Sequence, residues 1–211
     1  MGGGLRLRSA TGVIALVTAV VSLVELVLLN PDTVALSAGF IPARLSGLLH
    51  LSPAVPALLT PFSAALLHGS FVHLALNMAV LVFVGVQVER IIGPGGTVSL
   101  YICGAIVAAL AQWAADPASG TPMIGASGAI SALFGTYAML SARPKQVFAS
   151  PRLNRALHAA WLLAAWIVIQ WMTAALAGGE GMLLATPAHI GGFVAGLVLQ
   201  RPLLLWRYRE A

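Results

Sequence analysis

The sequence contains one cysteine and very little charge, and each shortage excludes a class of protein. Cys103 is the only cysteine among 211 residues, which excludes an internal disulfide framework and a thiolate metal cluster within one chain. Only 8% of the residues are charged, whereas about a quarter are charged in a typical soluble domain. There is no HExxH motif, no low-complexity segment and no convincing internal repeat. The remaining composition is 59% hydrophobic and indicates a polytopic membrane protein.

The apolar residues form six segments, which predict an all-α membrane protein built as a six-helix bundle. No polar block is long enough for a second domain, so we expect a single membrane domain over residues 1–211. Predicted turns separate the last five segments, at residues 93–96, 116–120, 143–145 and 178–181. The predicted helices span about 10–29, 71–92, 97–115, 123–141, 156–177 and 185–205.

The first predicted helix, residues 10–29, and the loop after it, residues 30–70, differ from the other segments. Residues 10–29 follow a basic start, as in a signal peptide, but they are long enough to span and we predict a retained helix. Glu25 lies within this helix and should face protein or the interface, because a carboxylate is costly in lipid. Residues 30–70 carry five prolines between short apolar pieces, which predicts an interfacial or re-entrant first loop.

The basic residues predict the orientation of the chain in the membrane. The net charge of +5 does not indicate a nucleic-acid partner, because the basic residues lie at helix ends. If the N-terminus is cytoplasmic, Arg44 is the only basic residue on the other side, and both termini are cytoplasmic. The ten basic residues on the cytoplasmic side are Arg6, Arg8, Arg90, Arg143, Lys145, Arg152, Arg155, Arg201, Arg207 and Arg209.

Four polar side chains from three predicted helices share one depth in this topology. His73 and Asn77 lie in the first turns of 71–92, Ser127 near the start of 123–141, and His189 near the start of 185–205. At ~1.5 Å of rise per residue, all four lie roughly 5–10 Å below the outer surface. The apolar pattern does not require this coincidence, which therefore indicates a site.

The chemistry of these four groups fits peptide-bond hydrolysis. Ser127 can act as the nucleophile and His189 as the base that takes its proton. His73 and Asn77, four residues apart on one helix face, can donate hydrogen bonds to an oxyanion together with the Ser127 amide. No carboxylate lies beside His189 at this depth, so we predict a Ser-His dyad and not a triad.

Small residues surround the two proposed catalytic side chains. Gly125, Ala126 and Gly128 flank Ser127 and leave room for an extended substrate strand. Gly192 and Gly196 follow His189 and allow its helix to approach the serine helix closely.

These motifs together resemble the rhomboid intramembrane serine proteases. The resemblance rests on Gly125-Ala126-Ser127-Gly128, on Ala188-His189-Ile190-Gly191-Gly192 with Gly196, and on His68-x4-His73-x3-Asn77, in this order on the predicted helices. It implies that Ser127 and His189 form the dyad, that His73 and Asn77 stabilise the oxyanion, and that His68 is structural near a water-accessible cavity. It also implies cleavage of transmembrane substrates near their extracytoplasmic end, in what we expect to be a bacterial plasma membrane. No cofactor, metal or nucleic acid is expected, and the oligomeric state is left open.

The chain departs from the family pattern at two places. Pro56-Ala57 stand in the first loop where many members carry Trp-Arg, and Ser131 stands where many carry a tyrosine that stacks on the catalytic histidine. Trp161, Trp166 and Trp171 are spaced around the fifth helix, so we predict lipid-facing or interfacial positions for them.

Two other functions compete with a protease. One is a catalytically inactive rhomboid-like protein that binds membrane clients, which would have no need of both Ser127 and His189. The other is a transporter, or a metal site that uses His68, His73 and His189. The absence of an acidic ligand at that depth and of paired discontinuous half-helices argues against it.

Overall fold

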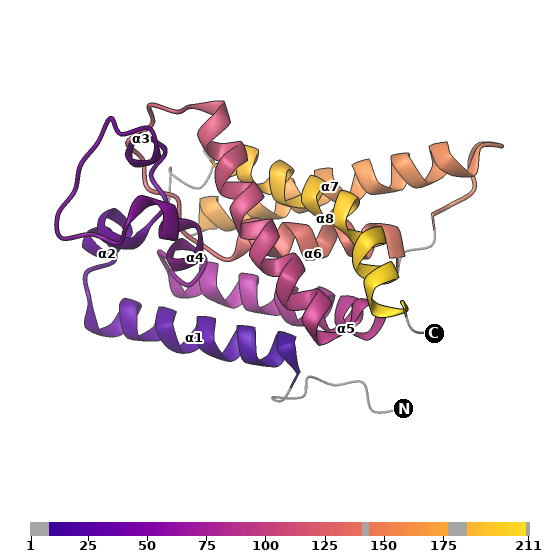
Figure 1. Cartoon of the computed structure of the whole chain (residues 1–211), viewed down its shortest axis with the longest axis horizontal. Helices are drawn as coiled ribbons and strands as arrows, with labels where there is room; N and C mark the ends of the chain where they lie inside the picture. Colours follow the sequence, from indigo (N-terminus) through magenta and orange to yellow (C-terminus); the bar gives the residue numbers. More distant parts are fainter. Residues whose placement is uncertain (1–8, 141–143, 177–184, 210–211) are drawn as a thin grey trace.

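The chain is all-helical in the computed structural model, which describes residues 9–140, 144–176 and 185–209. Four of the described helices are long and apolar enough to cross a membrane. The helices are α1 (Ala10–Leu28), α2 (Pro31–Ala38), α3 (Pro42–Leu45), η1 (Ala57–Leu59), α4 (Thr60–Ala64), α5 (Phe71–Ala115), α6 (Ser127–Leu140), α7 (Pro151–Leu176) and α8 (Thr186–Arg207). Figure 1 shows α1 beginning and α8 ending at one end of the bundle, with α2, α3 and α4 at the other.

Helix α5 consists of two legs that meet at Gly93. Gly93 has φ +78°, a left-handed conformation that glycine adopts without steric cost, and Pro94 starts the second leg, where its missing N–H is not needed. The hydroxyl of Thr97 donates to the Gly93 carbonyl oxygen at 2.8 Å. The predicted turn therefore lies at Gly93, although the predicted gap before residue 97 is absent because the helix resumes at once. The count of six spans remains a prediction.

The N-terminus of α1 is held by a carboxylate from α5. Glu89 accepts hydrogen bonds from the backbone N–H of Ala10 and Thr11 and from the Thr11 hydroxyl, at 2.6–2.9 Å. Ser9 caps the same turn through Gly12 N–H. These bonds satisfy backbone donors that a helix start leaves unpaired, and a negative charge is favourable there.

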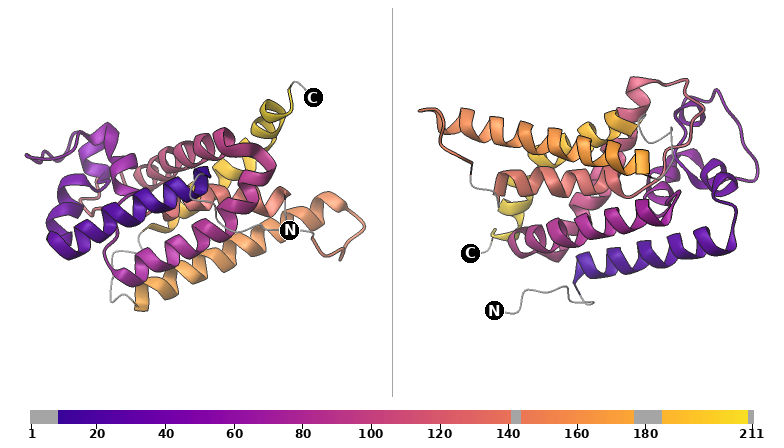
Figure 2. Two further views of the ribbon diagram at one scale, coloured as in Figure 1. Left: turned by 90° about the horizontal axis from the view of Figure 1, so that it is seen from below. Right: turned by 180° about the vertical axis from the view of Figure 1, so that it is seen from behind.

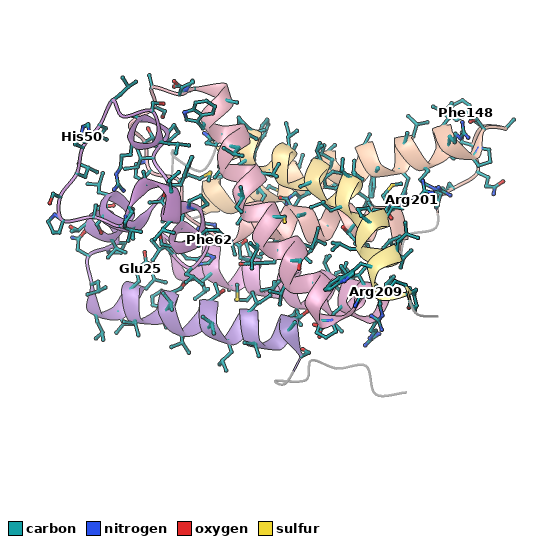
Figure 3. The ribbon with its side chains drawn as sticks, in the orientation of Figure 1. Glu25, His50, Phe62, Phe148, Arg201 and Arg209 are labelled. Atoms are coloured by element: carbon teal, nitrogen blue, oxygen red, sulfur yellow. The ribbon has the colours of Figure 1, made fainter. Side chains whose placement is uncertain are left out.

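The buried face of α1 is polar, and it includes Glu25. Thr11, Thr18, Ser22 and Glu25 are at most 1% exposed, whereas the opposite face is apolar and exposed. The prediction that Glu25 faces protein is confirmed, and Figure 3 shows it on the side of α1 that faces α2 and α4.

The predicted first loop, residues 30–70, contains α2, α3, η1 and α4. Pro31, Pro42 and Pro61 lie in the first turns of α2, α3 and α4, where proline is favourable because no N–H is required. Phe40 and Met123 exchange two backbone hydrogen bonds at 2.8 and 3.0 Å, which joins this region to the segment before α6. The first loop thereby packs at the end of the bundle where α6 begins.

Glycines allow α5, α6 and α8 to form the centre of the bundle. A Cβ on Gly192 would overlap the carbonyl oxygen of Gly128, and one on Gly196 would overlap that of Ala132. A Cβ on Gly104 would collide with Ala132. Such close approach is typical of membrane helices that associate through small residues. Figures 1 and 2 show α1 and α7 at opposite edges of this centre.

Two predicted helix starts are wrong by several residues. Helix α6 starts at Ser127 and not at 123, because Met123 pairs with Phe40 and Gly125 takes φ +118°. Helix α7 starts at Pro151 and not at 156, and Asn154 Oδ1 accepts from the backbone N–H of Phe148 at 2.9 Å. The predicted ends at 141 and 177 and the turn at 178–181 lie outside the described residues.

Candidate active site

Ser127 is the first residue of α6 and follows a turn that requires glycine at position 125. Gly125, two residues earlier, has φ +118° and donates its N–H to the Ala64 carbonyl oxygen at 2.9 Å. A side chain at position 125 would be strained and would also collide with the His73 ring. Ala126 is completely buried, and Ser127 is 6% exposed. The small residues therefore position the hydroxyl at the N-terminus of a helix, between α4 and α5.

The structure brings His189 to Ser127, although the two are 62 residues apart. Ser127 Oγ lies 2.8 Å from His189 Nε2, a hydrogen-bonding distance. The close contact of α6 and α8 at Gly128, next to Ser127, and at Gly192, about one turn from His189, makes this distance possible. Both side chains are buried. The free chain thus already has the hydrogen-bonded arrangement that a serine nucleophile and a histidine base would require.

Gln170 of α7 is a third group at this position that the sequence analysis did not identify. Its Nε2 lies 3.3 Å from His189 Nε2, and its side chain is 3% exposed. Because an amide NH₂ only donates, this contact favours a His189 tautomer with an unprotonated Nε2 and the proton on Nδ1. Among the described residues Nδ1 has no hydrogen-bond partner. The nitrogen that faces Ser127 is then the one able to accept its proton.

His73 and Asn77 lie on one face of the first leg of α5, near the segment before α6. The His73 ring packs against Gly125, and within the described part of the chain its Nε2 has no hydrogen-bond partner. Asn77 donates one amide hydrogen to the His73 carbonyl oxygen at 3.0 Å. Both side chains are 2% exposed. They border the serine segment through Gly125 and make no hydrogen bond with Ser127 that the structure describes.

His68 is fully buried between α1 and α5. Ser22 donates its hydroxyl hydrogen to the Leu66 carbonyl oxygen at 2.7 Å, so His68 Nδ1 at 2.8 Å must be the donor to Ser22 Oγ. The His68 backbone N–H donates to Glu25 Oε2 at 3.0 Å. The His68 and His73 rings meet edge to face, with centroids 4.8 Å apart. Burial, and to a lesser degree the neighbouring His73, lowers the pKa of His68 to about 3.

The prediction for Trp166 is wrong, whereas Trp161 and Trp171 are exposed as expected. Trp166 is 1% exposed, while the other two are 66% and 47% exposed. The Trp166 ring lies edge-on to the His189 ring, with centroids 6.4 Å apart. Its Nε1–H donates to Ser131 Oγ at 2.7 Å. The sequence signal was the pair Trp166 and Gln170, four residues apart, which is one face of a helix.

A cavity of about 20 Å³ adjoins Ser127 and His189. This volume accommodates about one water molecule. Its wall includes Ala64, Ala105 and Ala188, and neither His73 nor Asn77 belongs to its lining. Within the described residues no three histidine, cysteine, aspartate or glutamate side chains are close enough together to hold a metal ion.

Comparison with known proteins gives a consistent result. A family model described as Rhomboid domain matches residues 56–206, which include all four polar residues of the site. Over 139 residues the chain is 32% identical to a rhomboid protease GlpG of Pectobacterium atrosepticum and 30% identical to one of Serratia proteamaculans. Over 138 residues it is 28% identical to one of Yersinia pestis. The matches cover 65% of this chain, which spans about half the length of these relatives, at 45–46%.

Proposed function

The chain is an integral membrane protein of the rhomboid family, and on that premise we propose that it is an intramembrane serine endopeptidase. The observation that carries the proposal is the 2.8 Å hydrogen bond between Ser127 Oγ and His189 Nε2. A nucleophile and a base at this distance, buried among apolar helices, meet the basic geometric requirement of acyl transfer. The relatives named rhomboid protease support the same reaction class.

The reaction proceeds in two halves. His189 Nε2 takes the Ser127 proton as Oγ attacks the carbonyl carbon of the scissile bond, and the protonated ring then gives this proton to the leaving amine. Water hydrolyses the resulting acyl-enzyme with the same histidine as base. The cavity of about 20 Å³ beside Ser127 supports entry of one water molecule at a time.

The oxyanion is stabilised by donors around the start of α6. The Ser127 backbone N–H belongs to the first turn of the helix, where N–H groups have no intrahelical acceptor and the helix dipole favours negative charge. His73 and Asn77 supply side-chain donors from α5. The second amide hydrogen of Asn77 is available for this role without loss of its bond to the His73 carbonyl oxygen.

The substrate is a transmembrane helix cut near its extracytoplasmic end. Its backbone must leave the helical conformation to reach Ser127, since helical carbonyl groups are hydrogen-bonded and shielded. Gly125 and Gly128 line the cavity beside Ser127, but a Cβ on either would collide with the His73 ring or with Ala108. The expected free space at these small residues is therefore taken up by packing, and the substrate strand has to enter through the cavity. The entrance is α7 or the segment before α8, of which residues 177–184 lie outside the described part of the chain. Helix α7 is the least enclosed of the four long helices, because 17% of its span is buried, against 33–39% for the other three.

The decisive experiment incubates the purified protein with a fluorescently labelled transmembrane substrate beside Ser127→Ala. The wild type should cleave and Ser127→Ala should not, while both insert and unfold alike. A Thr136→Val variant controls for the loss of a buried hydroxyl in the same helix.

Two outcomes would contradict the proposal. Unchanged turnover by Ser127→Ala would mean that another nucleophile acts. Substrate binding without cleavage by the wild type would favour the catalytically inactive, client-binding alternative.

A further inference from the structure

A groove of about 500 Å³ separates the first half of α7 from the middle of α8. Its apolar wall includes Ala156, Ala160, Leu163 and Val194, and it shares no lining residue with the cavity beside Ser127. Ala156, Ala160 and Val194 are exposed, so the groove opens to the surroundings of the bundle. The groove therefore belongs to the lipid-facing surface and not to the proposed catalytic site.

Charge is confined to one end of this groove. Arg152 and Arg155, in the first turns of α7, line its mouth, whereas Leu163 lies about 12 Å of helix rise beyond Arg155. Arg201 follows the lining residue Leu197 by one turn on α8, and Figure 3 shows it near the end of the bundle where α7 begins. No acidic residue is part of the described lining. An anionic phospholipid has the complementary arrangement, because its negatively charged phosphate lies at one end and its apolar acyl chains extend from it.

We propose that this groove binds one anionic phospholipid. The phosphate contacts Arg152 and Arg155, and one acyl chain lies along Ala156, Ala160 and Leu163. Arginine recognises phosphate through its planar fork of N–H donors, and basic pockets between helices at the cytoplasmic side are typical sites for such head groups. A second copy of the chain is a poorer occupant, because a parallel neighbour would bring its own basic helix ends to the same level.

The test measures lipid retention by the full chain in neutral detergent. Phosphatidylglycerol and phosphatidylcholine with identical acyl chains are titrated, and bound lipid is counted by native mass spectrometry. One phosphatidylglycerol should bind more tightly than phosphatidylcholine. Arg152→Gln/Arg155→Gln should weaken it by about fivefold for each arginine removed. Ala160→Phe should weaken both lipids, because the ring fills the groove.

The matched control is Arg90→Gln/Arg209→Gln, which removes two basic residues from the same end of the bundle but not from the groove lining. This control should keep wild-type retention. Equal binding of the two lipids, or equal losses in the two double variants, would overturn the proposal. Full competition by glycerol phosphate would also overturn it, because a site for the phosphate alone does not use the groove.

A second inference rests on a separate chain of buried contacts around Trp166. Trp166 Nε1–H donates to Ser131 Oγ, and Ser131 Oγ–H donates to the Ser127 carbonyl oxygen, both at 2.7 Å. The ring lies between Phe134, stacked at 5.4 Å, and His189, edge-on at 6.4 Å. Trp166 thus contacts the histidine directly and the serine through one intermediate hydroxyl.

We infer that Trp166 and Ser131 are positioning residues for the Ser127–His189 pair, an inference that rests on the proposed function. Trp166 limits rotation of the His189 ring, and Ser131 transmits the position of α7 to the first turn of α6. Trp166 and Ser131 act through hydrogen bonds in a buried environment, where linked hydrogen bonds polarise and strengthen one another.

The test compares Trp166→Phe, Ser131→Ala and the double variant. Each single variant should slow labelling of Ser127 by a fluorophosphonate up to about tenfold, the value of one net hydrogen bond. The double variant should be no slower than Ser131→Ala, since Ser131→Ala already removes both the bond from Trp166 and the bond to the Ser127 carbonyl oxygen. Trp161→Phe, on an exposed face of α7, is the matched control and should label like the wild type.

A wild-type labelling rate for Trp166→Phe would overturn this inference alone. The same holds if the losses of labelling rate add in the double variant and are proportional to the fall in melting temperature. Absence of labelling in the wild type would instead reject the proposed function, and with it this inference.

Discussion

Asn77 already uses one of its amide hydrogens, and this shapes what its removal should do. In the proposed mechanism the other hydrogen serves the oxyanion, while the proton transfer uses only Ser127 and His189. We expect Asn77→Ala to lower kcat by ~10²–10³, the usual effect of losing one principal oxyanion donor. Cleavage of a labelled transmembrane substrate measures this. His189→Ala, measured in parallel, should be inactive and should fail to react with a fluorophosphonate. Equal labelling of His189→Ala and wild type would exclude His189 as the base.

His68 should make folding stability depend on pH. Its pKa is about 3 in the folded chain against an ordinary value near 6.5, so the unfolded chain binds the extra proton over this interval. The stability is therefore complete above about pH 6.5 and declines as the pH falls toward 3, by about 1.4 kcal/mol per pH unit. Thermal unfolding in detergent should show a shallower decline for His68→Asn. An identical slope in the variant would mean that His68 is not buried in its neutral form.

The residues of the site differ in how far the sequence could predict them. Ser127 and His189 were identifiable because each has small neighbours and both lie at one depth. Trp166 and Gln170 share one face of α7, but the sequence does not show that this face turns inward, because α7 also carries large apolar side chains on its exposed faces. Their burial depends on how α7 packs against α6 and α8, which is a tertiary property.

At the scale of helices, the contact of α6 with α8 determines the distance between the proposed catalytic groups. A Cβ on Gly192 would overlap the Gly128 carbonyl oxygen and crowd Ser131. We expect Gly192→Ala to destabilise the fold by about 1–3 kcal/mol through overpacking and to lower kcat more than KM, because the helices must separate. Unfolding in detergent and cleavage kinetics measure the two effects.

Gly120→Ala is the control, since a Cβ there meets no atom within 4 Å. Wild-type stability and kcat in Gly192→Ala would mean that the contact is not tight.

The helix boundaries illustrate a similar limit of the sequence. The pattern of apolar residues runs continuously from 123 into α6, so it could not reveal that Met123 pairs with Phe40, 83 residues earlier. The turn at Gly93 was predictable, because Gly93-Pro94 carries its own local signal. Local chemistry was thus readable from the sequence, whereas partners distant in the chain were not.

At the scale of the whole molecule, α1 begins and α8 ends at the same end of the bundle. With the uneven distribution of basic residues, this leads us to expect both termini in the cytoplasm. Cysteine labelling at residues 3 and 209, with Cys103→Ser as the background, should find both positions inaccessible from outside intact cells. A position at residue 118, in the turn after α5, should be accessible. External labelling of either terminus would reject the six-span topology.

The two ways in which helices pack have different consequences for evolution and for protein engineering. The α6–α8 contact has no room for a larger side chain, so almost any substitution of its glycines should destabilise the fold. The residues of this contact should therefore change little during evolution. Helix α7 buries few of its residues and can exchange most of its outward side chains without loss of the fold. Altered selectivity should therefore arise by drift at the exposed positions of α7. A library intended to retarget the proposed protease should randomise those positions and leave Trp166, Gln170 and the glycines unchanged.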